Sequence, residues 1–381
     1  MTDQAVSVIH LITDLDVGGA EIALLRLVST ASLASIRHHV VSLKSNGRLE
    51  SEIRSLGIPV TVLDLNDTRS FGHAFVRLAR LLRAERPDVV ITWLYHADLL
   101  DTLTNLLTIR TRLIWNIRCA DMDLSRYSAM TRALPRILAW LSRRPDVIIA
   151  NSNAGRIAHE AYGYRTTAWK VIPNGFDTSR FHPDTQARQR TRADLGVEIT
   201  TPLVGLIARF DPMKDHETFF FAAAKVIEAV PSVRFLLVGR GTEGAEIRQL
   251  IAASGAPSNR FILLGERLDI PDILAALDLG VSSSRTEGFS NTIGESMASG
   301  VPCVVTDVGD SAIIVGDTGR VVPKASPQQL AQAMIEVLTL PVDQRAALGA
   351  AARERITRYY AIGGTSQRYA ETILNVVNSG L

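Results

Sequence analysis

Short runs of apolar residues alternate with longer stretches of helix length along almost the whole chain of 381 residues. The first run, Val6 to Thr13, is followed by a Gly18-Gly19 pair and then by a helical pattern from Ala20 to Ser29. Most runs are apolar throughout, which is typical of parallel strands covered by helices on both faces. The alternation therefore predicts an α/β fold of doubly wound parallel sheets. Further strands are expected at His39 to Leu43, Val60 to Leu63, Val89 to Thr92, Leu113 to Ile117, Val147 to Ala150, Leu203 to Ala208, Phe235 to Gly239, Phe261 to Leu264, Gly280 to Ser283 and Cys303 to Thr306.

The alternation is interrupted near the middle of the chain. Residues Val171 to Pro183 contain two prolines and an Asn-Gly pair, and the polar, basic stretch Thr185 to Arg192 follows. We interpret this region as a linker. At roughly 150 residues per domain, the length also fits two domains. We expect two Rossmann-like domains facing a central cleft, an N-terminal one at 1–172 and a C-terminal one at 173–362, and a last helix at 363–381.

Composition narrows the class of protein. The chain has 41 Lys and Arg against 39 Asp and Glu, and 46% of its residues are hydrophobic, which excludes a disordered or fibrous protein. Residues 1–172 carry 21 basic and 16 acidic side chains, and the remainder carries 20 and 23. We expect no nucleic-acid partner.

Cysteine usage and the first residues bear on the compartment. Cys119 and Cys303 lie far apart, so neither a disulfide framework nor a Cys-x-x-Cys metal site is predicted. The N-terminus lacks the positive region of a signal peptide, and no apolar stretch reaches the roughly 18 residues that span a bilayer. We therefore expect a cytoplasmic protein.

The stretch Ser282 to Asp310 carries the most chemical information. Glu287 and Glu295 are separated by seven residues across a strand end, a loop and a helix start. A helix N-terminus presents free backbone N–H groups that suit a phosphate, and the glutamates suit sugar hydroxyls. The residues alone leave a second interpretation open, in which Ser or Asn caps the helix and both glutamates are surface residues.

This stretch resembles the donor-binding segment of retaining glycosyltransferases with the GT-B fold, of the large family-four type (glycosyl transferases group 1), whose hallmark is EGFxxxxxE. The resemblance extends to Gly205 through Asp215, to Ile172 through Asp177, and to the glycine loop Gly18-Gly19-Ala20-Glu21. It implies transfer of a sugar, with retention, from a nucleotide-sugar such as a UDP-sugar to a hydroxyl acceptor in polysaccharide or cell-envelope glycan synthesis. It implies neither a metal nor a further cofactor, because the nucleotide-sugar is a substrate.

The resemblance also implies roles for individual residues. Arg209 and Lys214 are expected to neutralise the donor diphosphate, whose negative charge grows as the glycosidic bond breaks. These two residues and Glu287 form the expected catalytic set. Glu295 matches the glutamate that binds ribose. The expected donor-binding residues are Gly18, Gly19, Arg209, Lys214, Gly241, Arg267, Leu268, Glu287, Phe289, Ser290, Asn291, Thr292 and Glu295.

Three residues of the first half are candidates for contacting the acceptor. By the same resemblance, the domain at 1–172 is expected to bind the acceptor and the domain at 173–362 the nucleotide-sugar. Asn116 lies near the end of the expected strand Leu113 to Ile117 and Arg118 follows it, where many relatives carry a histidine. A guanidinium stays charged near neutral pH, so Arg118 is expected to act electrostatically or to bind the acceptor. His96 follows the strand Val89 to Thr92, and a hydrogen-bonded structural role is the alternative for this histidine.

Two motifs resemble other kinds of site. Asp14-Leu15-Asp16 imitates a metal-binding Asp-x-Asp, and Gly239 to Gly244 reads GxGxxG, as in dinucleotide-binding proteins. We disfavour both interpretations, since the first lies beside the glycine loop and the second lies within the expected donor domain.

Residues 124–144 form a basic, amphipathic segment with five arginines and no acidic residue. One hypothesis is that this segment contacts anionic lipid, so that the enzyme reaches a lipid-linked acceptor at the inner face of the plasma membrane. The alternative is that its apolar face packs on the first sheet. The last helix is expected to cross back to the first domain.

Two other functions stay open at this point. A sugar-nucleotide 2-epimerase has the same two-domain architecture, although the catalytic acids it needs are not identifiable here. A non-catalytic nucleotide-sugar-binding protein is the second alternative.

Overall fold

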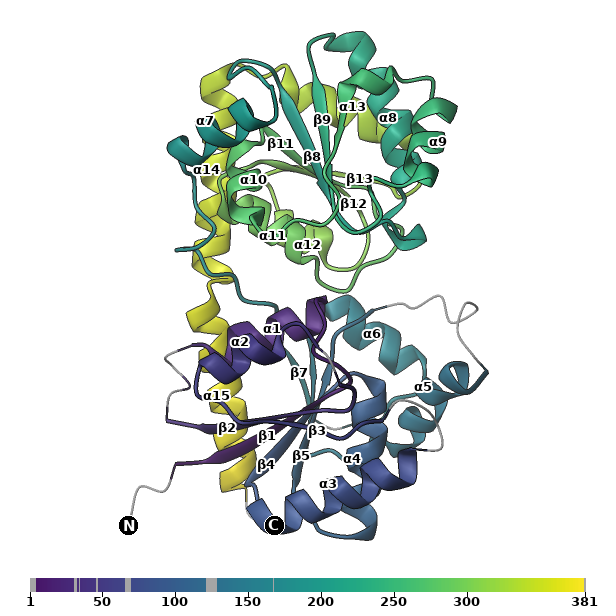
Figure 1. The fold of residues 1–381 in the computed structure, drawn as a ribbon, viewed down its shortest axis with the longest axis vertical. Helices are drawn as coiled ribbons and strands as arrows, with labels where there is room; N and C mark the ends of the chain where they lie inside the picture. Colours follow the sequence, from purple (N-terminus) through teal and green to yellow (C-terminus); the bar gives the residue numbers. More distant parts are fainter. Residues whose placement is uncertain are drawn as a thin grey trace. The chain divides into compact units, whose positions relative to one another are not determined.

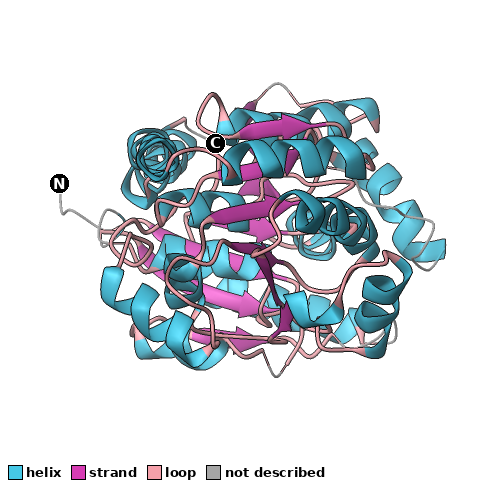
Figure 2. Cartoon of the chain, turned by 90° about the horizontal axis from the view of Figure 1, so that it is seen from above, coloured by secondary structure: helices cyan, strands magenta, loops and turns pink. Residues whose placement is uncertain are grey.

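The computed structural model describes residues 5–30, 33, 35–45, 47–65, 70–120, 129–166 and 168–379. The chain divides into two compact units. Unit 1 comprises Met1–Gly175 and Ile362–Leu381, and unit 2 comprises Phe176–Ala361. Each unit contains one parallel sheet with helices on both faces (Figures 1 and 2), as the apolar strand patterns predicted.

Unit 1 contains a seven-stranded parallel sheet in the order β3-β2-β1-β4-β5-β6-β7. The return from β3 to β4 places helices on both faces: α1 and α15 pack on one face, and α3 and α4 on the other. Its strands are β1 (Ser7–Ile12), β2 (Arg37–Ser42), β3 (Val60–Val62), β4 (Val89–Trp93), β5 (Arg112–Ile117), β6 (Val147–Ala150) and β7 (Trp169–Val171). Its helices are α1 (Gly19–Val28), α2 (Glu50–Ser55), α3 (Phe71–Glu85), α4 (Tyr95–Leu107), α5 (Ala129–Leu141), α6 (Asn153–Ala161) and α15 (Ile362–Asn378).

Unit 2 contains a six-stranded parallel sheet in the order β10-β9-β8-β11-β12-β13. Its strands are β8 (Leu203–Ile207), β9 (Arg234–Val238), β10 (Phe261–Leu263), β11 (Leu279–Ser282), β12 (Cys303–Thr306) and β13 (Arg320–Val322). Its helices are α7 (Thr185–Asp194), α8 (His216–Ala229), α9 (Ala245–Ala253), α10 (Ile270–Ala276), α11 (Asn291–Ala298), α12 (Ser311–Val315), α13 (Pro327–Leu338) and α14 (Val342–Tyr359), with short 3₁₀ turns at Pro212–Lys214 and Ser258–Arg260.

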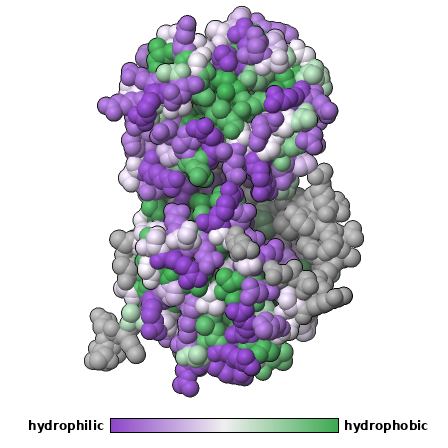
Figure 3. Space-filling view, viewed as in Figure 1, coloured by the Kyte–Doolittle hydropathy of each residue, from purple (hydrophilic) through white to green (hydrophobic). Residues whose placement is uncertain are grey.

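The two strands that the apolar pattern did not predict are β7 and β13. Each has three residues, contains a cation and lies at one edge of its sheet. An edge strand has a neighbour on one side only, so its residues need not all be apolar. Polar side chains of both units cover most of the face seen in Figure 3.

The stretch Thr185 to Arg192, interpreted above as part of a linker, is helix α7 of unit 2. Two of its arginines bind the same carboxylate: Arg188, which is partly exposed, and Arg192, which is buried, pair with Asp278 at 2.7 and 2.5 Å. Counting charges could not show this, because a buried arginine and an exposed one read alike in the sequence.

The division between the units also differs slightly from the expected one. The first crossing follows Gly175 instead of residue 172, because Ile172 packs in the core of unit 1 and Asn174 accepts a 2.6 Å hydrogen bond from Arg118. The second crossing precedes Ile362, so all of α15 belongs to unit 1. Among the described residues, no helix has both the length and the apolar character needed to cross a bilayer.

Candidate functional site

Two loops meet at the carboxyl edge of the unit 2 sheet. The Lys214 loop (residues 208–215) follows β8, and the Glu287 loop (residues 283–290) follows β11, the strand beside β8. The ammonium of Lys214 lies 2.5 Å from Oε1 of Glu287, and both side chains are largely buried. The hydroxyl of Ser284 donates to the same oxygen at 2.8 Å. The fold thus joins two residues of the expected catalytic set that are 73 positions apart.

Arg209 is the third residue of that set and lies at the start of the Lys214 loop. Its side chain is 47% exposed and pairs with Asp211 at 3.2 Å. An ion pair this exposed is weak, so an incoming anion can compete for the guanidinium at low cost. The loop therefore presents two cations at one sheet edge.

The glycine turn after β9 lies against the Lys214 loop. Gly239 has φ +142°, and a Cβ there would come 2.3 Å from the carbonyl oxygen of Ala208. Gly241 has φ +87°, with the Cβ of Phe210 as its nearest neighbour. Close backbone approach explains these glycines of the GxGxxG motif without a dinucleotide.

Helix α11 follows the Glu287 loop. Ser290 is its N-cap residue but makes no side-chain capping bond, and its hydroxyl lies 3.3 Å from that of Thr292. Asn291 and Glu295 lie within α11, and Glu295 is buried. Phe289 stacks on Phe176 in the core of unit 2, so its side chain serves packing.

The loop after β10 carries Arg267 and Leu268, two of the expected donor-binding residues. Arg267 pairs with Asp269 at 2.5 Å on the surface, and Leu268 is 79% exposed. An apolar side chain this exposed is available to cover a flat ring.

The expected acceptor residues of unit 1 have mixed placements. The amide of Asn116 has no exposed surface and donates to the hydroxyl of Tyr369 at 2.9 Å, so it holds α15 and does not face solvent. Arg118 donates to Asn174 and lies 5.4 Å from the ring centroid of Trp93. Burial lowers the pKa of Arg118. Both residues therefore tie together parts of unit 1.

His96 and the Gly18-Gly19 loop lie at the carboxyl edge of the unit 1 sheet. His96 is partly exposed in the first turn of α4, where desolvation and the charge of Lys44 lower its pKa. Glu21 lies in the first turn of α1, and burial raises its pKa to about 7. No role for Glu21 follows from the sequence, because its position at the start of a helix does not show that its side chain is buried.

The Asp14-Leu15-Asp16 motif is occupied by other contacts. The backbone N–H of Asp16 donates to Asp14 at 3.2 Å, and Arg48 pairs with Asp16 at 2.7 Å. Within the described part of the chain, no three His, Cys, Asp or Glu side chains are grouped so that they could hold a metal ion.

Two family models match the chain. "Glycosyltransferase Family 4" matches residues 17–180, and "Glycosyl transferases group 1" matches residues 201–340. The chain belongs to glycosyltransferase family four. The resemblance seen in the sequence is thereby confirmed. The first match extends eight residues past position 172, where the charge count divided the chain, and the second lies wholly beyond it.

Curated relatives of this family-four chain include two bacterial mannosyltransferases. The lipopolysaccharide core biosynthesis mannosyltransferase LpsB of Rhizobium meliloti (strain 1021) is 32% identical over 228 residues, 58% of this chain and 62% of that protein. A GDP-mannose-dependent monoacylated alpha-(1-6)-phosphatidylinositol monomannoside mannosyltransferase of Corynebacterium glutamicum is 32% identical over 205 residues, 51% of this chain and 53% of that protein. The chain thus matches between half and two thirds of the length of these relatives.

Solved structures confirm the predicted fold. Anabaena Alr3699/HepE, in complex with UDP and glucose, has a TM-score of 0.84 and 25% identity, with 97% of this chain and all of that chain covered. Sucrose-phosphate synthase of Thermosynechococcus elongatus has a TM-score of 0.85 at 18% identity, over 98% and 100% of the two chains. The fold is the two-domain GT-B fold.

Proposed function

We propose that this chain transfers a sugar from a nucleotide-sugar to a hydroxyl acceptor with retention of anomeric configuration. The observation that carries the proposal is the meeting of Lys214 with Glu287 at the carboxyl edge of the unit 2 sheet, beside Arg209. In open α/β sheets ligands bind outside the carboxyl ends of strands. Unit 2 is proposed to hold the donor and unit 1 the acceptor.

The proposed reaction breaks the bond between the anomeric carbon and the diphosphate oxygen. A bond from the same carbon to the acceptor oxygen forms on the same face of the sugar, and the acceptor proton passes to the leaving diphosphate. Arg209 and Lys214 stabilise the negative charge that the diphosphate gains as the bond breaks. They therefore stabilise the transition state more than the ground state. Glu287 is proposed to accept hydrogen bonds from the transferred sugar and Glu295 from the ribose. The proposed reaction uses no metal ion.

A UDP-sugar is the proposed donor. The Anabaena structure named above is a complex with UDP and glucose, and it matches nearly the whole chain. The Corynebacterium relative is described as GDP-mannose-dependent, so GDP-mannose is the second donor to test.

The donor proposal is tested by thermal unfolding with UDP, GDP, UDP-glucose and GDP-mannose, followed by product analysis. A nucleotide that binds the native state raises the unfolding temperature by mass action. Lys214→Ala should lower turnover by about 100-fold or more, the range seen when one charge-stabilising group is removed. Lys225→Ala removes an exposed lysine of α8 and is the matched control. Donor binding without any turnover would indicate a non-catalytic binding protein.

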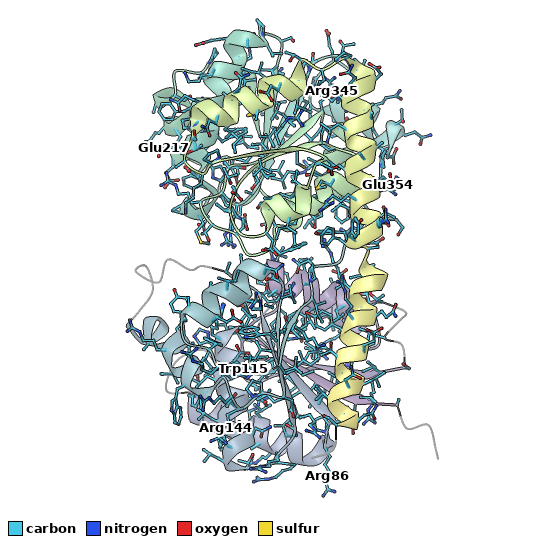
Figure 4. The ribbon with its side chains drawn as sticks, turned by 180° about the vertical axis from the view of Figure 1, so that it is seen from behind. Arg86, Trp115, Arg144, Glu217, Arg345 and Glu354 are labelled. Atoms are coloured by element: carbon cyan, nitrogen blue, oxygen red, sulfur yellow. The ribbon has the colours of Figure 1, made fainter. Side chains whose placement is uncertain are left out.

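The acceptor is proposed to be lipid-linked, with unit 1 touching an anionic membrane at the inner face of the plasma membrane. Residues 124–128 of the basic segment lie outside the described residues. In α5, Leu134 and Leu138 are buried, as the packing alternative requires, whereas Trp140 is 79% exposed. Arg143 and Arg144, three and four residues further along the chain, are exposed as well, and Arg144 is labelled in Figure 4. An exposed tryptophan next to arginines suits a membrane interface.

Vesicle co-sedimentation tests the membrane proposal. Binding should increase with the fraction of phosphatidylglycerol in phosphatidylcholine vesicles and should weaken in Trp140→Ser. Val342→Ser, at an equally exposed apolar position of unit 2, is the control. Equal binding to neutral and anionic vesicles would count against the proposal.

A further inference from the structure

The Lys214 and Glu287 loops are joined by more than the Lys214–Glu287 pair. The backbone N–H of Arg285 donates to the carbonyl of Met213 at 2.8 Å, and the hydroxyl of Ser283 donates to the carbonyl of Lys214 at 2.9 Å. The guanidinium of Arg285 also pairs with Asp215, the residue after Lys214. Three contacts therefore fasten the backbone on both sides of Lys214 to the loop that carries Glu287.

The pair between Arg285 and Asp215 is bidentate. Nε of Arg285 lies 2.9 Å from Oδ2 of Asp215, and Nη2 lies 3.2 Å from Oδ1. Two parallel N–H donors on one carboxylate fix its orientation as well as its position. The Arg285 side chain is 52% exposed, whereas that of Asp215 is 2% exposed. Solvent can therefore reach the guanidinium of the pair, while the carboxylate is shielded from it.

Asp215 needs such support because its backbone is in the left-handed region, with φ +49°. It is also the N-cap of α8, where its two carboxylate oxygens accept from the N–H and the hydroxyl of Thr218. A non-glycine residue in this conformation persists only when its surroundings hold it. The backbone angles of Asp215 set the position of the preceding residue, Lys214, relative to helix α8.

We propose that Arg285 is a positioning residue for Lys214, acting through Asp215; this inference rests on the proposed donor site. The guanidinium of Arg285 pairs with Asp215, whereas the ammonium of Lys214 pairs with Glu287. Its guanidinium fixes Asp215 and cancels the charge of that carboxylate. Without it, a negative charge would lie one residue from the ammonium that is proposed to meet the diphosphate.

Steady-state kinetics and diphosphate binding of the full chain test this proposal. Arg285→Met removes the fork and the charge, and kcat/KM for the nucleotide-sugar should fall by about 10-fold to 100-fold, as small misplacements of a catalytic group do. Arg285→Lys keeps the charge without the fork and should show an intermediate loss. Arg190→Met removes an exposed arginine that pairs with Asp272 at 3.4 Å and should leave kcat/KM unchanged.

A double-mutant cycle separates positioning from direct contact with the donor. Asn at position 215 still caps a helix and tolerates the left-handed backbone, but it does not need a guanidinium. If Arg285 acts through Asp215, the losses in Arg285→Met and Asp215→Asn are not additive, and the loss from Lys214→Ala becomes smaller in the Arg285→Met background. Additive losses, or an unchanged kcat/KM in Arg285→Met, would overturn the proposal.

Binding of UDP and GDP distinguishes this proposal from the proposed function. A wild-type chain that binds a diphosphate but transfers no sugar refutes the proposed reaction only, and a weaker affinity of Arg285→Met for that diphosphate still supports the positioning role. A wild-type chain that binds neither diphosphate refutes both.

Discussion

Residue-scale chemistry in this protein depends on which charges the fold buries. In unit 1, Asp101 of α4 is fully buried, and neither of its oxygens has a hydrogen-bond partner among the described residues. Burial raises its pKa from 3.8 to about 7. The neighbouring Asp98 is also buried, and it accepts a 2.6 Å hydrogen bond from Thr92. In the folded state, burial favours the neutral, protonated form of such a carboxyl group over its charged form.

The stability of unit 1 should therefore fall as pH rises from about 4 to about 7. Over this range the folded state keeps a proton on Asp101 that the unfolded state releases, and above pH 7 the penalty is constant, at about 4 kcal/mol at most. Asp101→Asn should flatten this dependence in urea unfolding measured at several pH values. Glu52→Gln, at an exposed position of unit 1, should leave the slope as in the wild type. An unchanged slope in Asp101→Asn would contradict the assignment.

A second residue-scale prediction concerns Arg192, whose side chain is 1% exposed. It donates to the carbonyls of Ala276 and Thr201 and to the carboxylate of Asp278. Arg192→Ala leaves these acceptors partly unsatisfied and should lower the free energy of unfolding by about 3 to 5 kcal/mol. In Arg190→Ala the change should stay within about 0.5 kcal/mol, because that ion pair is exposed. Chemical denaturation followed by circular dichroism measures both.

At the scale of elements, loops after strands hold the candidate site, and glycines allow them to approach closely. Gly309, after β12, has φ +57°, and a Cβ there would lie 2.2 Å from the carbonyl oxygen of Glu287. The N–H of Asp310 donates to the carbonyl of Gly288 at 3.0 Å. The segment after β12 thus packs against the backbone of the Glu287 loop and supports it.

Gly309→Ala should both strain the backbone and displace the Glu287 loop. We expect a loss of more than about 2 kcal/mol in stability, together with weaker donor binding in the thermal-shift assay. Gly364→Ala is the control: a Cβ at this α15 position meets no atom within 4 Å, and alanine should stabilise the helix by up to about 1 kcal/mol. Normal donor binding by Gly309→Ala would show that the loop tolerates the shift.

At the scale of the whole molecule, the two units differ in how they use the chain. Unit 2 is continuous, and its ends meet: the N–H of Phe176 donates to the carbonyl of Tyr360 at 2.8 Å. Unit 1 is discontinuous, because α15 packs its apolar face into the core and Tyr369 stacks on Trp93. Unit 1 therefore cannot be complete until α15 has been synthesised.

Two fragments test this difference. Residues 176–361 alone should unfold cooperatively and retain most of the affinity for the nucleoside diphosphate, since all the expected donor-binding residues except Gly18 and Gly19 lie within them. A chain that ends at residue 361 should lose the stability of unit 1 and keep that of unit 2, as two separated transitions in calorimetry would show. A single transition at the wild-type temperature in the truncated chain would contradict the assignment of α15 to the core of unit 1.

The class of fold and the two parallel sheets follow from the amino-acid sequence, and so does the choice of the Lys214 and Glu287 loops as candidates, because strand runs, glycine turns and the Glu287–Glu295 spacing are local patterns. Three contacts become visible only in three dimensions: Lys214 pairs with Glu287, Arg285 pairs with Asp215, and Asn116 donates a hydrogen bond to Tyr369 of α15. Each of these contacts joins segments at least 70 residues apart. Burial and proximity at that separation depend on the packing of all the intervening elements, so no local pattern records them.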